Sequence, residues 1–421
     1  MLNKTLIAIR SFVVSAGATA ASSFVGVFGV YLGASASEMG WLQSSSTALS
    51  NGGQIFWGRL SDRIGLRRPF LIVGSGILAL LWYIMSYSSS PLSLIVTYAL
   101  ISLFGSLITV NWFSLIADQT ESSTRGRFLS IINILSSVGT IISLIVMTFL
   151  FTGTEKNDIF IPFSTAAGSY VVSGILMAML KEENHKIRVA GSIRKTIGNL
   201  KSEHHFYRYF VAMNVQGIFW SMAWPMFPIT IVSVMNFSLS QVAYLTVASL
   251  SVTIAVQYIL GKLTDRINRP PVIFANRAML SLIPVMYALF SNFPQFIILE
   301  VYSGFLGSIQ NVVMNSYLLD IVPSAHRAEY ISIMNGFNGL IYLIGALIGG
   351  YLLQELLSFF PLHTALEVAY FCVFAGRLGS SFLFMRLKEP EKRGKAPLGL
   401  YSLILRLKQP GNPSGGTFRF R

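Results

Sequence analysis

Residues 58–69 read Gly-Arg-Leu-Ser-Asp-Arg-Ile-Gly-Leu-Arg-Arg-Pro and lie between two long apolar runs. The first eight positions return at residues 261–268 as Gly-Lys-Leu-Thr-Asp-Arg-Ile-Asn, 203 residues later. That spacing is close to half of the 421-residue chain. A repeat of this period indicates that the chain consists of two homologous halves.

The repeat extends beyond this stretch. Other positions that match between the halves at a spacing of 202 or 203 residues are Gln54 with Gln257, Gly105 with Gly307, Asp118 with Asp320 and Arg125 with Arg327. Each half therefore carries one charged loop after its second apolar run and another after its fourth.

The composition indicates an all-α polytopic membrane protein. Hydrophobic residues make up 53% of the chain and charged residues only 11%, which is too little charge to cover the surface of a soluble protein of this size. Apolar runs of about 20 residues, the length that crosses a bilayer as a helix, predict twelve spans. They are residues 6–33, 38–58, 69–88, 92–117, 128–152, 159–181, 207–234, 238–260, 270–290, 293–319, 328–354 and 364–386.

The net charge of +14 could suggest a nucleic-acid partner, but the basic residues are concentrated in short loops between the spans. With a cytoplasmic N-terminus, the inner loops hold Arg59, Arg63, Arg67, Arg68, Arg125, Arg127, Lys262, Arg266, Arg269 and Arg327, and the outer loops hold only Lys156. Because cytoplasmic loops retain Lys and Arg, both termini are predicted to be cytoplasmic and no nucleic-acid partner is expected.

The sequence offers little for catalysis or cofactor binding. Cys372 is the single cysteine, so a disulfide within the chain and a Cys-based metal site are both excluded. The five histidines lie in loops or at helix ends, and no Gly-rich phosphate loop with Gly-Lys-Ser/Thr occurs. We therefore expect a protein that is not an enzyme, with no cofactor, no metal and no ATP hydrolysis.

The stretch at 58–69 resembles the signature loop between helices 2 and 3 of the major facilitator superfamily, roughly G-x-L-A-D-R-x-G-R-R/K. The second copy is less complete and has Asn268 in place of the second glycine. Matching residues are Gly58, Leu60, Asp62, Arg63, Gly65, Arg67 and Arg68, with Gly261, Asp265 and Arg266 in the second copy.

The resemblance implies two pseudo-symmetric six-helix bundles related by an axis along the membrane normal. Residues 1–181 would form the N-terminal bundle, 182–206 a cytoplasmic linker and 207–386 the C-terminal bundle. Residues 387–421 would form a cytoplasmic tail that is mostly disordered. We expect a monomer.

In this superfamily the charges that match Asp62, Arg63 and Arg67 help to lock the two bundles together on the cytoplasmic side. A cytoplasmic gate is therefore predicted, with Gly58 and Gly65 permitting close helix approach and a tight turn. Its further members are Arg68, Asp118, Arg125, Gly261, Asp265, Arg266, Asp320 and Arg327. The alternative is a solvated loop that only sets the topology.

Polar residues inside the spans are candidates for a substrate cavity, because they are costly in lipid. By resemblance, helices 1, 4, 7 and 10 line that cavity, and Pro225 and Pro228 predict a break in helix 7. The candidates are Arg10, Ser15, Thr19, Asn111, Asn214, Gln216, Trp220, Asn311 and Asn315. Helix packing is the alternative for the hydroxyls, and snorkelling to the inner headgroups is the alternative for Arg10. Arg377 has no partner that the sequence identifies.

Glu300 is the one acid placed well inside a span, roughly 10 Å from its outer end at 1.5 Å per residue. A carboxyl that changes its charge state is what a proton-coupled carrier needs, so Glu300 is the candidate for proton coupling. The alternative is a glutamate that reaches the outer headgroups.

We therefore expect a secondary transporter of the plasma membrane that moves a small organic solute by alternating access, with protons as the coupling ion. Export of an amphipathic compound is favoured over the alternative, uptake of a sugar or an organic acid by a symporter or uniporter. Ile101 stands where many proton antiporters of the superfamily carry an arginine, and residues 128–152 lack the G-P-x-x-x-G-G pattern of drug exporters. A membrane receptor on the same scaffold is the alternative from another class.

Overall fold

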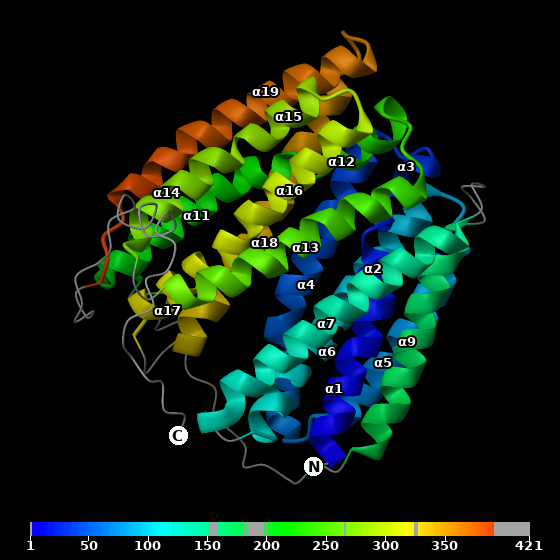
Figure 1. The fold of residues 1–421 in the computed structure, drawn as a ribbon, viewed down its shortest axis with the longest axis vertical. Coiled ribbons are helices and arrows are strands. Elements are labelled where there is room, and N and C mark those ends of the chain that lie inside the picture. The colour runs from blue at the N-terminus through cyan, green and yellow to red at the C-terminus, as the bar shows by residue number, and fades with distance from the viewer. Residues whose placement is uncertain are drawn as a thin grey trace, which may run out of the picture.

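The computed structural model describes residues 2–120, 122–151, 158–180, 182, 198, 200–264, 267–323 and 327–390. Its long elements are helices, and they form two groups that diverge toward one end of the molecule (Figure 1). The predicted all-helical fold is confirmed. Lys156, most of the predicted linker and the tail from residue 391 lie outside the described residues.

The N-terminal half contains six spanning segments. The first is interrupted and consists of α1 (Leu2–Val14), a π-helical turn η1 (Ser15–Thr19), α2 (Ala20–Ser22) and α3 (Val25–Tyr31). The others are α4 (Ala36–Ile64), α5 (Arg68–Met85), α6 (Pro91–Asp118), α7 (Ser122–Leu150) and α9 (Phe160–Met179).

The C-terminal half repeats this order with more interruptions. After the 3₁₀ turn η2 (Leu200–Ser202), the seventh segment consists of α11 (His204–Met222), α12 (Met226–Ile229) and the π-helical turn η3 (Thr230–Val234). It is followed by α13 (Leu239–Leu263), α14 (Arg269–Leu280) with α15 (Leu282–Leu289), and α16 (Phe293–Ile309) with the π-helical turn η4 (Gln310–Met314) and α17 (Asn315–Ile321). The last two segments are α18 (Arg327–Leu356) and α19 (Leu362–Ser381), which ends in the 3₁₀ turn η6 (Phe382–Arg386).

The helix caps repeat with the sequence. Ser35 caps α4 through a capping box with Glu38, and Ser238, 203 residues later, caps α13 through a box with Gln241. Ser90 and Asn292, 202 residues apart, cap α6 and α16 in the same way. Since a capping box satisfies free N–H groups at a helix start, the local signals that begin these helices were duplicated together with the spans.

Eleven helical stretches of the described residues are long and apolar enough to cross a bilayer. The remaining predicted span, α4, is a 29-residue helix but carries many Ser, Gly, Asn and Gln residues. It packs along α18 of the other half, so part of its surface faces protein where lipid would otherwise lie. The chain is a multi-pass membrane protein.

The two halves contact each other closely at one end. An added Cβ at Gly40 would lie 3.2 Å from the Cα of Gly350, so the backbones of α4 and α18 nearly touch there. Nearby, the Ser44 Oγ donates to the carbonyl of Leu343 at 3.0 Å. On the other side of the interface, the Ser240 Oγ of α13 donates to the carbonyl of Thr148 of α7 at 3.4 Å.

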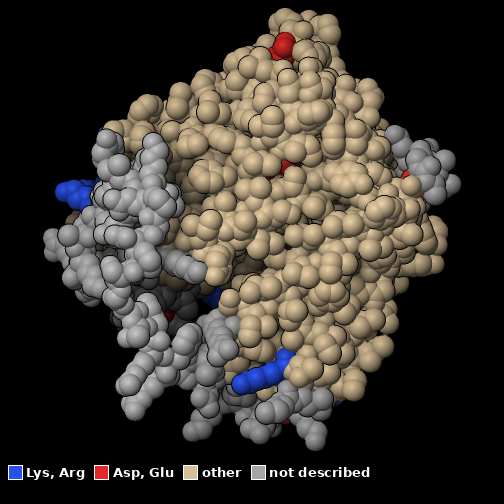
Figure 2. Space-filling model, viewed as in Figure 1, with Lys and Arg blue, Asp and Glu red and all other residues tan. Residues whose placement is uncertain are grey.

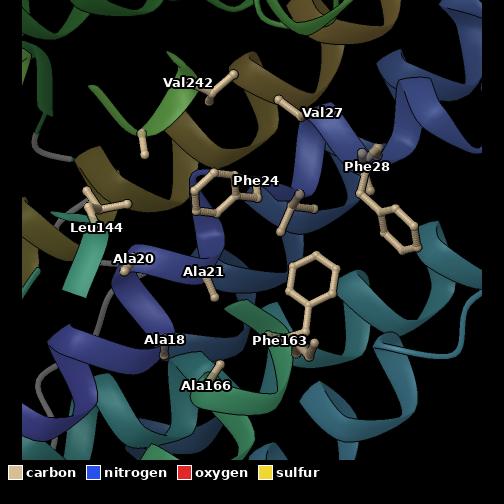
Figure 3. Packing of buried hydrophobic residues seen from close by; sticks show 14 of the residues in the cluster. Ala18, Ala20, Ala21, Phe24, Val27, Phe28, Leu144, Phe163, Ala166 and Val242 are labelled. Atoms are coloured by element: carbon tan, nitrogen blue, oxygen red, sulfur yellow. The ribbon is translucent and has the colours of Figure 1, made fainter. Parts of the chain in front are cut away.

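The first spanning segment helps to fill this closed end. Figure 3 shows Phe24, Val27 and Phe28 projecting among Leu144 of α7, Phe163 of α9 and Val242 of α13. Phe24 and Val27 are at most 3% exposed. The apolar contact therefore joins residues of both halves.

The halves separate toward the opposite end, where α4 meets α5 and α13 meets α14 (Figure 1). Figure 2 shows a hollow between the halves, and the Lys and Arg side chains visible on this face lie toward the same end. The molecule is therefore closed at the end of its outer predicted loops and open at the end of its basic loops.

Candidate functional site: a cavity with a buried arginine

A cavity of about 500 Å³ lies within the N-terminal half, lined by residues from all six of its spanning segments. Its walls combine hydroxyl groups of Ser and Thr with the aromatic side chains of Trp82, Tyr98, Trp112 and Tyr170. Arg10 is the one charged residue in this lining among the described residues. Two of the predicted cavity residues, Ser15 and Thr19, also line it.

Arg10 is buried inside the bundle, with 3% of its surface exposed. Its Nε donates to the Ser173 Oγ at 2.9 Å, and its guanidinium carbon lies 4.0 Å from the centre of the Trp112 ring. The Nη2 atom has no hydrogen-bond partner in the described part of the chain. These contacts hold Arg10 within the protein and do not fit the snorkelling alternative.

Asn111 points away from this cavity. It is fully buried and its Nδ2 donates to the carbonyl of Leu107 at 2.9 Å on the same helix. Its neighbour Trp112 lines the cavity instead. Asn111 does not line this cavity, and its place in a substrate cavity stays a prediction.

Two predicted residues of the seventh spanning segment, which begins with α11, lie beside a second buried arginine, Arg277 of α14. The Gln216 Nε2 lies 3.5 Å from the carbonyl of Arg277, and the guanidinium lies 5.0 Å from the centre of the Trp220 ring. Arg277 Nη2 contacts the Met314 sulfur at 2.6 Å, and its Nη1 has no partner among the described residues. Asn214 donates to the carbonyl of Phe210 on its own helix at 2.7 Å.

Asn311 and Asn315 are exposed in the tenth spanning segment, in η4 and at the start of α17. The Nδ2 of Asn315 donates to the carbonyl of Asn311 at 3.0 Å. Both follow the start of the π-helical turn η4, which changes the rotation of the helix relative to a regular α-helix. Neither residue lines the cavity that contains Arg10 or the cavity that contains Glu300.

Arg377, which the sequence leaves without a partner, satisfies backbone carbonyls at two helix breaks. Its nitrogens donate to the carbonyls of Phe219 at 3.2 Å, Trp220 at 2.8 Å and Leu280 at 3.3 Å. α11 ends at Met222 just before Pro225, and Pro284 lacks the N–H that would bond Leu280. The guanidinium replaces the missing helical donors, so Arg377 has a structural role.

Glu300 lines a second cavity of about 300 Å³ that lies between the two halves. Its carboxyl hydrogen-bonds the side chain of Ser249, and Gln43, Thr246 and Ser22 also line the space. No Lys, Arg or His of the described residues lines it. Ser22 also lines the larger cavity, so the two adjoin each other. Glu300 thus faces a protein cavity and not the outer headgroups.

The loop after α4 is held within the N-terminal half. Gly65 ends α4 with a φ of 75°, a conformation that favours glycine, and the Arg67 Nη1 donates to the Ser61 Oγ at 2.6 Å. The carboxylate of Glu182 accepts from the backbone N–H groups of Arg67 at 2.7 Å and Arg68 at 2.8 Å. This acid therefore caps the start of α5, where the helix dipole favours a negative charge.

An equivalent cluster lies at the start of α14 in the C-terminal half. Arg269 is 1% exposed, and its Nη1 binds an Asp320 carboxylate oxygen at 2.7 Å. Its backbone N–H and Nε donate to the carboxylate of Glu389 at 2.9 and 2.7 Å. Each of these contacts joins elements of one half, so the described gate contacts do not bridge the halves in this open arrangement.

The other predicted gate residues make few contacts among the described residues. Arg63 is exposed, and an added Cβ at Gly58 would lie at an ordinary 3.5 Å from Val110, so close helix approach is not what glycine provides there. At Gly261 an added Cβ would meet nothing within 4 Å. Asp265 and Arg266 lie outside the described residues, as do the side chains of Asp62, Asp118, Arg125 and Arg327.

Several residues that shape these sites were not selected from the sequence. Trp82, Trp112 and Tyr170 belong to apolar runs and carry no polar pattern that separates them from ordinary core residues. Glu182 and Glu389 lie just outside the spans, and their position after the last helix of each half was the available signal. No cluster of three or more His, Cys, Asp or Glu residues suited to a metal occurs in the described residues.

Comparison with known families gives one match that covers nearly the whole chain. A family profile described as Major Facilitator Superfamily matches residues 7–208 and, separately, residues 209–412. The two matches meet within five residues of the start of α11. No curated protein sequence matches the chain.

Solved structures with the same fold include several transporters. A single-site mutant of the nucleoside transporter NupG has a TM-score of 0.73 at 13% identity, with 92% of this chain and 100% of that chain covered. A bacterial homologue of the human lysosomal transporter Spinster, inward-facing and occupied, has a TM-score of 0.66 at 12% identity, with 90% and 93% covered. A D-xylose-proton symporter has a TM-score of 0.64 at 15% identity, with 94% and 98% covered.

Proposed function

The chain belongs to the major facilitator superfamily, and on that premise we propose that it carries a small amphipathic organic solute across the plasma membrane by alternating access. The transporter class follows from the family. The solute, the direction and the coupling ion are the parts that we propose.

The proposal rests on an arrangement in which the two halves are in contact at one end and apart at the other. The halves touch through Gly40 and Gly350 at one end and diverge at the other, and two adjoining cavities lie between these ends. A carrier that exposes one site to each side in turn needs two bundles that rock around such a site. A receptor on the same scaffold would not need the contact at the closed end to break.

The orientation follows from the charges. The end at which the halves diverge carries the basic loops that follow α4 and α13, and basic loops are retained in the cytoplasm. We therefore assign the described arrangement as open to the cytoplasm, with both termini on that side. In this arrangement the described contacts of Arg67 and Asp320 lie within their own halves, and we propose that the gate residues bridge the halves when the cavity opens outward.

The character of the cavity favours an amphipathic solute. Five aromatic residues and several hydroxyl groups line it, so both apolar and polar parts of a ligand find partners. We keep export as the proposed direction and uptake of a sugar or an organic acid as the alternative.

Exchange of a labelled solute tests the transporter assignment. Purified protein in liposomes loaded with one unlabelled solute at a time, drawn from amphipathic acids, amines, nucleosides and sugars, is expected to accumulate the matching labelled solute transiently. A receptor would bind a solute without exchanging it. Absence of exchange for every solute that binds would therefore contradict the proposal.

Proton coupling through Glu300 is tested in the same liposomes. Glu300→Gln removes the ionisable group and keeps the size, so we expect exchange without a pH gradient to persist and gradient-driven accumulation to disappear. Glu355→Gln, at an exposed position near the outer end of α18, is the matched control. Gradient-driven accumulation that survives in Glu300→Gln would remove Glu300 from the coupling mechanism.

A further inference from the structure

We propose that the cavity of the N-terminal half binds an aromatic monocarboxylate. Its carboxylate would accept hydrogen bonds from Arg10, and a second acceptor group would bind the indole N–H of Trp82. This inference rests on the proposed transport function and names the substrate class for it.

The hydrogen-bonding capacity of Arg10 is largely unused. Of the five N–H donors of a guanidinium, Nε–H is bound to Ser173 and Nη2 has no partner among the described residues. Trp112 covers one face of the group, so a ligand would approach its terminal edge. That edge presents two parallel N–H groups, which is the geometry that binds both oxygens of a carboxylate.

A second buried donor in the same cavity also lacks a partner. Trp82 is 3% exposed and lines the cavity, and its Nε1 has no hydrogen-bond partner within the described chain. Indole N–H and guanidinium groups can only donate. Two buried donors without a partner favour a ligand that carries acceptors, and the charge of Arg10 disfavours a cationic amine.

The charge of the cavity sets the charge of the ligand. Arg10 is the one charged residue among the described lining residues, so a ligand with a single negative charge leaves the occupied site neutral. A phosphate monoester would carry close to two negative charges at pH 7, of which Arg10 compensates one. A carboxylate is therefore favoured over a phosphate.

The walls favour an aromatic body on that carboxylate. Tyr98 and Tyr170 join Trp82 in the lining, and the cavity of about 500 Å³ lies within the usual range of pockets for small organic ligands. Aromatic rings pack on one another in edge-to-face or offset contacts. The hydroxyl groups of the cavity can bind a ring substituent.

Calorimetric titration of the purified protein in detergent tests this site. The probes are benzoate, 4-hydroxyphenylacetate and indole-3-acetate, each paired with its neutral amide, and phenyl phosphate as the dianion. We expect at least one carboxylate to bind, its amide to bind at least tenfold more weakly, and phenyl phosphate to bind more weakly than benzoate.

The variants separate charge from shape. Arg10→Met is expected to weaken binding of the carboxylate about 30-fold or more, since truncating one partner of a buried charged pair costs at least ~2 kcal/mol, and to leave binding of the amide unchanged. Trp82→Phe, which removes the N–H and keeps an aromatic ring, is expected to weaken binding several-fold. Arg386→Met, the same change at an exposed arginine outside the cavity, is the matched control and should keep the preference for carboxylates.

Three results would overturn the inference. They are the absence of binding by all three carboxylates, equal binding of acid and amide, and unchanged carboxylate binding by an Arg10→Met protein that elutes as a folded monomer. Failure of the site and failure of transport remain distinct. Exchange of neutral solutes without carboxylate binding would leave a transporter with another substrate, whereas carboxylate binding without exchange would leave the site and remove the transport function.

Discussion

Replacing Arg377 with methionine should destabilise the C-terminal half. Methionine has a similar length but no donor, so the carbonyls of Phe219, Trp220 and Leu280 lose the hydrogen bonds that Arg377 provides. Arg377 is 1% exposed, and water has little access to replace those bonds. Unsatisfied carbonyls in such an interior are costly.

The size of the effect follows from the three bonds. Side-chain hydrogen bonds inside membrane proteins average ~0.6 kcal/mol each, and bonds to a charged group reach ~1.5–3 kcal/mol. The bond to Trp220 at 2.8 Å is the short one, and the other two are longer than 3.1 Å. We therefore expect a loss of about 2–4 kcal/mol in the free energy of unfolding, after the relief of burying the guanidinium is included.

Equilibrium unfolding in detergent, followed by tryptophan fluorescence, measures this loss. Trp220 and Trp224 lie at the break that Arg377 supports, so their emission reports the affected region. Arg386→Met changes an exposed arginine at the end of the same segment and should cost less than ~0.5 kcal/mol. If Arg377→Met costs no more than this control, the assignment of Arg377 to the helix breaks is wrong.

Three further substitutions test other parts of the structure. Gly350→Val should force α4 and α18 apart at the closed end, where an added Cβ already meets the Gly40 Cα at 2.9 Å. A steric cost of ~1–3 kcal/mol should shift the protein toward the outward-open state. A cysteine placed at Ser22 should then be alkylated faster by an impermeant maleimide that is added outside. An unchanged rate would contradict that closure. Glu182→Gln should cost ~1 kcal/mol of unfolding free energy through the weakened cap on α5. Glu389→Gln should cost about 2 kcal/mol, because Arg269 also loses one of its two carboxylate partners and keeps Asp320. Equal small losses would mean that these clusters are solvated.

Much of the fold could be predicted because its signals are local or periodic. Span length follows from bilayer thickness, and the 203-residue repeat places the same loop and the same capping serine in both halves, as Ser35 and Ser238 show. The end of α4 at Gly65 follows from a single glycine in a left-handed conformation. None of these features depends on which side of a helix faces which neighbour.

The site was less predictable because it depends on how each helix is rotated about its own axis. Asn111 and Trp112 are adjacent in sequence, yet Trp112 faces the cavity and Asn111 faces the helix packing. The π-helical turns in helices 1, 7 and 10 change the rotation further. The partners of Arg10 and Arg377 lie more than 90 residues away in sequence, and such contacts leave no spacing pattern.

In the proposed mechanism, the two halves must separate at their closed end for transport. A cysteine pair at positions 148 and 240, in a Cys372→Ser background, places one thiol on each half where Ser240 contacts Thr148. Cross-linking this pair in liposomes should abolish exchange of the solute found in the counterflow assay, and reduction should restore it. Exchange at the uncross-linked rate by a fully cross-linked protein would contradict the account.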